Sequence, residues 1–576
     1  MKKWLCLFIL CCQTPCFAKA NYQVEVEGVK GDLKKTLLQT LSLSQPDLDL
    51  SDAEQLNWYA DLGVEELQNG LKTFGYYHAK VLLQRESSGK KSLYTYHLQL
   101  GPLVYINSVQ CELRGAGQQD DQLMLALEPL PLKPAEPFTN SHYEKAKAQV
   151  LQIIKNHGYA KAEYILNRVM INPETNEAHI EWQIATGEKH YFGQTRFEDN
   201  PLSESLLKRY LPYYFGWPYA NTQLQKVQSA LLQSQYYQNV IAEPQLQDDS
   251  LEVPIVVHLT PNPPNHYEAG IGYGTDTGPR GTASWLRRYV NQYGHQLSVS
   301  ANVSKVSDEI ETGYKIPGKH PANDWYQMRL LQTREDYDLG YARTVKASAE
   351  QIKVLGAWQR EAKVTTLYEN YREKEGDAFS QTALVIPSVV YQTTQSNDRF
   401  NPVEGHRFKW TLRGAWTTDN HLFSQTLINY KQLWHPYQRG LITGKVDLGL
   451  TFPDHSAELP LSLRFYAGGS NSVRGYVYRS LGPKETDAYG KVSVVGGSYM
   501  ATTSLGFEHF ITEKFAIGPF WDMGNAMNNW HTGFKSGIGL GLRYNTLIGP
   551  LRVDVAKPIN TAHGEVRMHL NIGPEF

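Results

Sequence analysis

The last eleven residues constrain the fold of this chain more than any other segment. In 566–576 (VRMHLNIGPEF), the apolar Val566, Met568, Leu570 and Ile572 alternate with polar residues, and an aromatic, Phe576, follows as a C-terminal signal. A period of two with one apolar side is typical of a transmembrane β-strand that faces lipid on one side and a wet lumen on the other. The edge of a sheet in a soluble protein can show the same pattern.

The N-terminus predicts a cleaved secretory signal peptide over residues 1–20. Two lysines at 2–3 precede an apolar run at 4–12, and 18–20 (AKA) supplies the small residues of a cleavage site. The run is far shorter than the ~20 residues that a membrane helix needs. Cleavage takes the formal net charge from −2 to −5, which offers no broad positive field for nucleic acid. It also leaves Cys111 as the one cysteine, so no internal disulfide and no cysteine metal site are expected.

The composition changes near residue 260. Before it, segments such as 145–157 (KAKAQVLQIIKNH) place apolar residues at helical spacing, and after it glycine, tyrosine and tryptophan alternate with polar residues. The segment 260–265 (TPNPPN) is a short stiff linker by composition. Without 18 uninterrupted apolar residues, membrane insertion would require a closed barrel. The 310 residues from Tyr267 onward provide room for about 16 tilted antiparallel strands.

Three related segments precede this junction. A helical pattern is followed each time by an aromatic motif and a strand-like run, so that Tyr76, Tyr159 and Tyr236 recur at intervals of 83 and 77 residues. A small α+β module repeated three times explains this spacing. A left-handed glycine would end each helix, although the third copy has Gln235 instead. The expected domains are three modules at 21–102, 103–188 and 189–262, and an all-β barrel at 265–576.

One long connection within the expected barrel stands out. It begins with 468–476 (GGSNSVRGY) and continues to about Tyr499, a length that is uncommon without function. Arg474 would need a carboxylate if this loop folds back into the lumen, and alternation in 520–524 (FWDMG) turns Asp522 inward. We therefore expect a charge-assisted contact between Arg474 and Asp522 that pins the loop inside the barrel. The alternative is a solvated arginine and an unrelated luminal carboxylate.

These motifs resemble the superfamily of outer-membrane protein assembly factors and two-partner secretion transporters. The three α+β modules resemble polypeptide-transport-associated (POTRA) domains, and 272–281 (GYGTDTGPRG) with 478–483 (YRSLGP) resemble the TamA branch. Segments 401–405 (NPVEG) and 549–558 (GPLRVDVAKP) also resemble motifs of this superfamily. One departure is 546–547 (TL), which stand where members of the superfamily often have a Ser-Pro pair. The paired motifs are V-R-G-Y in the loop, with Val473, Arg474, Gly475 and Tyr476, and F-x-D-x-G in a strand, with Phe520, Asp522 and Gly524.

The resemblance implies a protein of the Gram-negative outer membrane with its POTRA modules in the periplasm. It implies insertion and folding of outer-membrane β-barrel clients, autotransporters among them, captured by β-augmentation. It also implies a TamB-like, inner-membrane-anchored partner that docks on the first module. Two alternatives stay open: a two-partner-type secretion pore, although such transporters usually carry two POTRA modules, and a role in phospholipid transport between membranes.

Barrel closure requires the first strand, near Tyr267 to Thr275, to pair with the last, near 566–572. Glycines in the first strand leave few inward contacts, which predicts a weak seam that can open sideways toward a client strand. Bilayer thinning beside a short hydrophobic belt would lower the insertion barrier. The glycines could equally serve curvature alone. The expected seam residues are Gly270, Ile271, Gly272, Gly274, Leu570 and Ile572.

No motif predicts an enzyme. G-x-S-x-G and H-E-x-x-H are both missing from the sequence. The segment 313–320 (GYKIPGKH) departs from a phosphate loop because His320 replaces the required Ser or Thr, and the G-x-G run at 270–274 lies in a strand-like context. We therefore expect a non-enzymatic protein without metal or cofactor.

Overall fold

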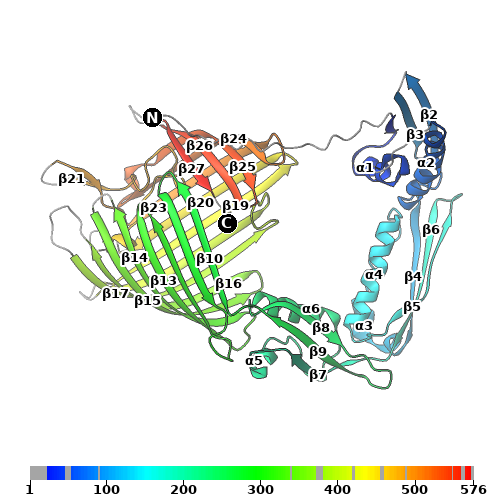
Figure 1. Cartoon of the computed structure of the whole chain (residues 1–576), viewed down its shortest axis with the longest axis horizontal. Helices are drawn as coiled ribbons and strands as arrows, with labels where there is room; N and C mark the ends of the chain where they lie inside the picture. The colour runs from blue at the N-terminus through cyan, green and yellow to red at the C-terminus, as the bar shows by residue number, and fades with distance from the viewer. Residues whose placement is uncertain are drawn as a thin grey trace, which may run out of the picture. The chain divides into compact units, whose positions relative to one another are not determined.

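The computed structural model describes residues 22–45, 53–88, 91–337, 340–371, 380–417, 422–453, 459–486, 490–547, 549–559 and 565–572 (Figure 1). The predicted signal peptide and the C-terminal Phe576 lie outside these ranges. Within them, no helix has the length and apolar character needed to span a membrane.

The region before the barrel contains three small mixed α/β modules (Figure 1). Each has a three-stranded sheet, in the orders β1-β3-β2, β4-β6-β5 and β7-β9-β8. In the first two, the central strand pairs in parallel with the first strand and antiparallel with the other. The first module has β1 (Tyr22–Glu27), α1 (Gly31–Thr40), α2 (Ala53–Thr73), β2 (Lys80–Ser88) and β3 (Lys91–Gln99). The second has β4 (Tyr105–Gly115), α3 (Asp121–Ala126), α4 (Asn140–Asn156), β5 (Glu163–Asn172) and β6 (Glu177–Gly187), and the third has β7 (Tyr191–Glu198), α5 (Glu204–Lys208), α6 (Asn221–Gln233), β8 (Tyr237–Pro244) and β9 (Glu252–Pro261).

The repeated motif ends a helix in every module. Gly75, Gly158 and Gln235 all have left-handed backbones, with φ of +89°, +107° and +67°. The third copy therefore keeps the backbone geometry without the glycine, at some conformational cost. Tyr159 and Tyr236 are buried, as the module-core interpretation predicts.

Asp120 connects this motif to the helix cap of the second module. Its carboxylate accepts from the backbone N–H groups of Gln122 and Leu123 at the start of α3, from the Tyr159 hydroxyl (2.9 Å) and from Lys189 Nζ (2.7 Å). Burial raises the pKa of Asp120, but the bonds from Lys189, Leu123 and Tyr159 outweigh it and hold this pKa at about 2.

Replacing Asp120 by alanine is expected to destabilise the second module by ~2 kcal/mol, because the cap and the ion pair are lost together. A depressed carboxyl pKa stabilises the fold above the unfolded-state value near 4, and this stabilisation is lost as the pH falls toward 2. The variant should therefore lose less stability than the wild type between pH 6 and pH 3. Pulse-labelling hydrogen exchange of 121–156 in urea, on the full-length protein, measures both effects. Asp121→Ala, an exposed neighbour, is the matched control and should change little.

The second part of the chain is a 16-stranded antiparallel sheet that curves into a barrel (Figure 1). Side chains alternate as the sequence predicts: Trp521 is exposed on the outside, whereas Asp522 is fully buried on the inside. The strands are β10 (Asn265–Gly274), β11 (Gly278–Arg287), β12 (Gln296–Ser304), β13 (Ser307–Pro317), β14 (Asp324–Tyr337), β15 (Gly340–Leu355), β16 (Trp358–Tyr371), β17 (Ser380–Ser396), β18 (Gly405–Thr417), β19 (Leu422–Tyr437), β20 (Gly440–Phe452), β23 (Tyr499–Phe510), β24 (Phe515–Met527), β25 (Lys535–Thr546), β26 (Gly549–Ile559) and β27 (Arg567–Ile572). A small hairpin of β21 (Lys484–Thr486) and β22 (Val492–Val494) lies in the long connection before β23.

Strand length differs around the barrel. β15 and β17 have 16 and 17 residues, whereas β10 has 10. At about 3.3 Å per residue, the wall is lower at the first strand than at β15 and β17.

Candidate functional site: the inward loop and the barrel seam

The connection between β20 and β23 folds back into the barrel. Its Val473 is fully buried and packs in a small apolar cluster with Phe465 of the same connection and Ala526 of β24. The Tyr476 hydroxyl donates to the carbonyl oxygens of Ser536 and Ile559, 3.4 Å from each. The loop is therefore held by side chains that contact the inner wall.

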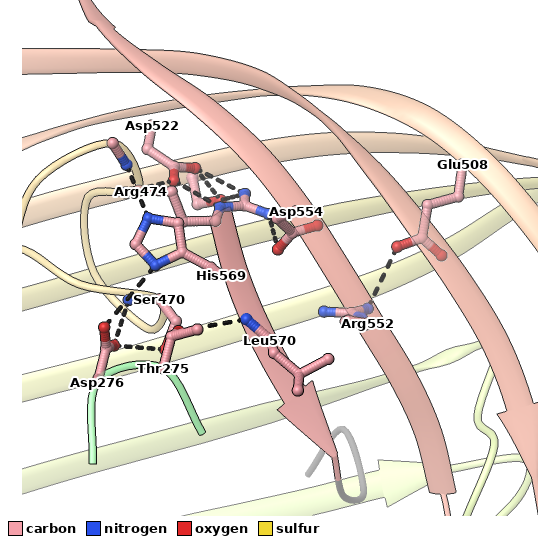
Figure 2. A network of polar contacts seen from close by, with 12 residues as sticks. Thr275, Asp276, Ser470, Arg474, Glu508, Asp522, Arg552, Asp554, His569 and Leu570 are labelled. Carbon is pink, nitrogen blue, oxygen red and sulfur yellow. Dashed lines mark hydrogen bonds and ion pairs between the residues drawn. The ribbon is translucent and has the colours of Figure 1, made fainter. Parts of the chain in front are cut away.

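Arg474 and Asp522 form the contact at the centre of this site (Figure 2). Arg474 Nε and Nη2 donate to the two carboxylate oxygens of Asp522, at 2.7 and 2.8 Å, and the Arg474 backbone N–H donates to the same group at 3.0 Å. The side chain of Asp522 is fully buried and that of Arg474 is 14% exposed. A bidentate ion pair in such a site fixes both the position and the orientation of the loop.

Three further groups complete the arginine's surroundings. Arg474 Nη1 donates to Asp554 of β26 (3.0 Å), and Nη2 donates to Ser504 of β23 (3.1 Å). The guanidinium carbon lies 3.4 Å from the centroid of the Phe520 ring, a stacked cation–π arrangement. Sequence reasoning missed the roles of Asp554 and Ser504. Asp554 belongs to the segment 549–558 of the sequence analysis, but strand register was needed to bring it to Arg474.

The loop also contacts both strands of the seam (Figure 2). Asp276, in the turn after β10, accepts from the backbone N–H and the hydroxyl of Ser470, both at 2.6 Å. The Gly475 N–H donates to His569 Nε2 on β27 (3.0 Å), so this nitrogen carries the lone pair. His569 Nδ1 lies 3.8 Å from Asp276 Oδ1. None of these three polar residues was expected from the sequence.

The expected backbone pairing of the first and last strands is absent from the residues that the structure describes. In the part of the chain that the structure describes, the sheet begins at β10, which pairs with β11, and ends at β27, which pairs with β26. The direct hydrogen bond across the seam runs from the Leu570 N–H to Thr275 Oγ1 (3.2 Å). Ile271 of β10 is 97% exposed rather than packed against a partner.

Two glycines of the predicted motifs make room for close backbone approach. A Cβ at Gly524 would lie 2.6 Å from the Ala501 carbonyl oxygen, and a Cβ at Gly475, where φ is +94°, would lie 3.0 Å from Pro558 N. In the seam, Gly270, Gly272 and Gly274 lie on β10, and Leu570 and Ile572 lie on β27. No group of three or more His, Cys, Asp or Glu that could hold a metal occurs among the residues described.

Gly537 offers a direct test of the loop's position. This residue lies opposite Asp522 in the β24–β25 register, and a Cβ here would lie 2.0 Å from the Arg474 carbonyl oxygen. We expect Gly537→Ala to push the loop off the wall, which should increase hydrogen exchange of 470–476 at least tenfold. A control is Gly444→Ala, since a Cβ at Gly444 meets nothing within 4 Å. Unchanged exchange in Gly537→Ala would contradict this placement.

The fold and the site together define an outer-membrane β-barrel protein whose barrel follows POTRA modules and contains an inward loop. Residues 265–576 match the Omp85 superfamily domain, and residues 23–100 match "POTRA domain TamA domain 1". The chain belongs to the Omp85 superfamily, because the first match covers more than half of it.

Two known proteins are similar to this chain. The outer membrane protein assembly factor BamA of Nitratidesulfovibrio vulgaris is 23% identical over 431 residues, which cover 70% of this chain and 53% of that protein. The chain thus spans about half the length of this curated relative. The crystal structure of BamA from Haemophilus ducreyi lacking POTRA domains 1–3 is similar with a TM-score of 0.66 at 18% identity, covering 82% of this chain and 99% of that one. At this identity the similarity concerns the fold alone.

Proposed function

We propose that this chain inserts and folds β-barrel proteins into the outer membrane through the seam between β10 and β27. The observation that carries the proposal is the seam itself, which lacks a backbone ladder within the described strands and is bridged by side-chain contacts and the inward loop. An unpaired edge of β10 can accept an incoming strand by backbone hydrogen bonds, which tolerate any client sequence.

The low wall beside the seam supports the same proposal. A hydrophobic belt built on β10, with 10 residues, is shorter than one built on β17, with 17. A bilayer next to a short belt thins to match it, at a cost of fractions of a kcal/mol per Å. A thinner bilayer presents a lower barrier to a client strand that must cross it.

The POTRA modules support a proposal for the client and the partner. The match of residues 23–100 to the first TamA POTRA domain supports a TamB-like, inner-membrane-anchored partner that docks on the first module. It also supports autotransporter-type clients. In the described strands, the edge strands β2 and β5 of the first two sheets each have one unpaired side, which suits capture of an extended segment by β-augmentation.

The experiment that tests this function uses vesicles of phosphatidylethanolamine and phosphatidylglycerol that contain the full-length protein. A urea-unfolded autotransporter barrel is added, and its folding is measured by protease resistance. We expect folding at least tenfold faster than in vesicles without the protein. Client that crosses the membrane without integrating would identify a secretion pore. Lipid exchange between vesicles without client folding would identify phospholipid transport, and either result would overturn the proposal.

A further inference from the structure

The connection that carries the inward loop contacts two opposite sides of the barrel. In the order of the 16 strands, β14 is the fifth and β24 is the thirteenth, so half of the barrel separates them. Arg474 binds Asp522 of β24, whereas Arg479, five residues later, binds β14. Arg479 Nη2 donates to Glu335 Oε1 at 2.9 Å, and these two side chains are 24% and 26% exposed.

The two arginines are bound in the same way. Each contacts a carboxylate and an aromatic ring that lie two residues apart on one strand, and such residues face the same side of a sheet. For Arg479 these are Glu335 and Tyr337. Its guanidinium carbon lies 4.7 Å from the Tyr337 ring centroid, and the Tyr337 hydroxyl donates to Glu335 Oε2 at 2.6 Å. On β24 the corresponding residues are Asp522 and Phe520. Both walls therefore present an acidic and an aromatic group to an arginine of the connection.

The backbone at Arg479 supports a specific role for this residue. Its φ is +57°, a left-handed conformation that residues other than glycine rarely adopt. The Arg479 N–H donates to the Gly468 carbonyl oxygen (3.4 Å), and Leu481 and Ala467 exchange two backbone hydrogen bonds of 2.9 and 3.0 Å. The returning segment is thus fastened to the start of the loop. Conformational strain of this kind persists where the surrounding contacts fix it.

The first part of the same connection covers the inner wall on the β14 side of the barrel. The Ser462 N–H donates to Glu369 Oε1 of β16 (3.3 Å), and Glu369 is fully buried. Leu459 and Leu463 are buried in one apolar cluster with inner-wall residues of β16, β17, β18 and β19. These wall residues are Leu367, Leu384, Ile386, Ala415 and Phe423. The connection therefore fills part of the lumen with packed side chains.

We propose that Arg479 is a second anchor of the inward loop, and that the two anchors hold the connection across the lumen and close it to solutes. Barrels of 16 to 18 strands otherwise leave an aqueous channel. A plug attached to one wall can swing aside, whereas a plug attached to opposite walls cannot move without breaking an ion pair. This inference does not rest on the client-folding function, because it concerns the passage of ions when no client is present.

The test measures ion conductance of the full-length protein in planar lipid bilayers without client. We expect the wild type to be closed and Arg479→Ala to have a mean conductance at least fivefold higher. Hydrogen exchange of 477–481 should rise in the same variant. Arg479→Glu/Glu335→Arg should restore low conductance, because the exchanged charges can pair again, and a general folding defect would not be rescued in this way. Glu335→Gln, which keeps the side-chain volume, should also raise conductance and serves if Arg479→Ala does not fold.

The matched control is Arg329→Ala. Arg329 pairs with Glu350 between β14 and β15, so this variant removes an ion pair within the wall itself, and its conductance should stay at the wild-type value. Unchanged conductance in Arg479→Ala, or an equal increase in Arg329→Ala, would overturn the role of the second anchor. A wild type that conducts like an open porin would overturn closure of the lumen by the connection.

Discussion

Replacing Arg474 by alanine is expected to release the inward loop and to reduce client folding at least tenfold. The change leaves Asp522, which is fully buried, without its bidentate partner, and Asp554 loses a 3.0 Å contact. Removing one partner of a buried ion pair costs ~3–5 kcal/mol, because the other charge stays buried and uncompensated. The turn after β10 and β27 should lose a shared anchor as well, since the same loop contacts Asp276 and His569 through its neighbouring residues. The β10 edge that is proposed to template the client is then no longer held in position.

Two measurements separate this effect from general destabilisation. Hydrogen exchange of 470–476 should rise in Arg474→Ala, and Arg474→Ala/Asp522→Ala should recover part of the lost stability. Arg329→Ala is the matched control. Arg329 pairs with Glu350, whose side chain is 1% exposed, on the β14–β15 wall. That variant should lose similar stability but keep its loop and its client folding. Equal loss of client folding in both variants would contradict a specific role of the loop.

Covalent closure of the seam is expected to stop client folding reversibly. Cysteines are introduced at Thr275 and Leu570, because the Leu570 N–H donates a hydrogen bond to the Thr275 side chain. Neighbouring positions on both sides of the seam are then scanned for a pair with disulfide geometry. Cys111 is first replaced by serine. Oxidation should reduce the folding rate at least tenfold, and reduction should restore it.

The control for this tether uses the same chemistry on strands that stay paired. Val553 and Leu570 are register partners in the β26–β27 ladder. A disulfide between cysteines at these positions should leave client folding unchanged. If the Thr275–Leu570 tether forms completely and folding continues at the wild-type rate, the client does not enter through this seam.

Sequence alternation was sufficient to predict which residues face the lumen. A buried arginine also needs a carboxylate partner. These two considerations together predicted a contact between Arg474 and Asp522, and the structure has an ion pair between them. The other groups at the site could not be predicted in the same way. Asp276 and Ser470 are 194 residues apart, and their contact depends on how deeply the loop enters and on which strands end the sheet.

Other features of the structure also could not be predicted from the sequence, because they depend on strand register or on tertiary packing. The contact between Arg479 and Glu335 depends on the register of β14, and a slip of one residue would turn Glu335 to the other face. The missing ladder between β10 and β27 in the described residues could not be predicted either, because alternation indicates that both segments are strands but not whether they pair with each other. Gln235 shows the reverse case, because tertiary packing imposes a left-handed backbone that the residue type does not favour.

The most direct test of the central claim is disulfide mapping between β10 and a client caught during folding. Single cysteines at Ala269, Gly270, Ile271, Gly272 and Tyr273 are combined with single cysteines along the client's last strand. If β10 pairs with the client's last strand, disulfides should form at one fixed register and on alternate residues, since directly opposite side chains lie on the same face of a sheet. Disulfides from the client to luminal positions such as Lys409, with none to β10, would contradict the account and would indicate passage through the lumen.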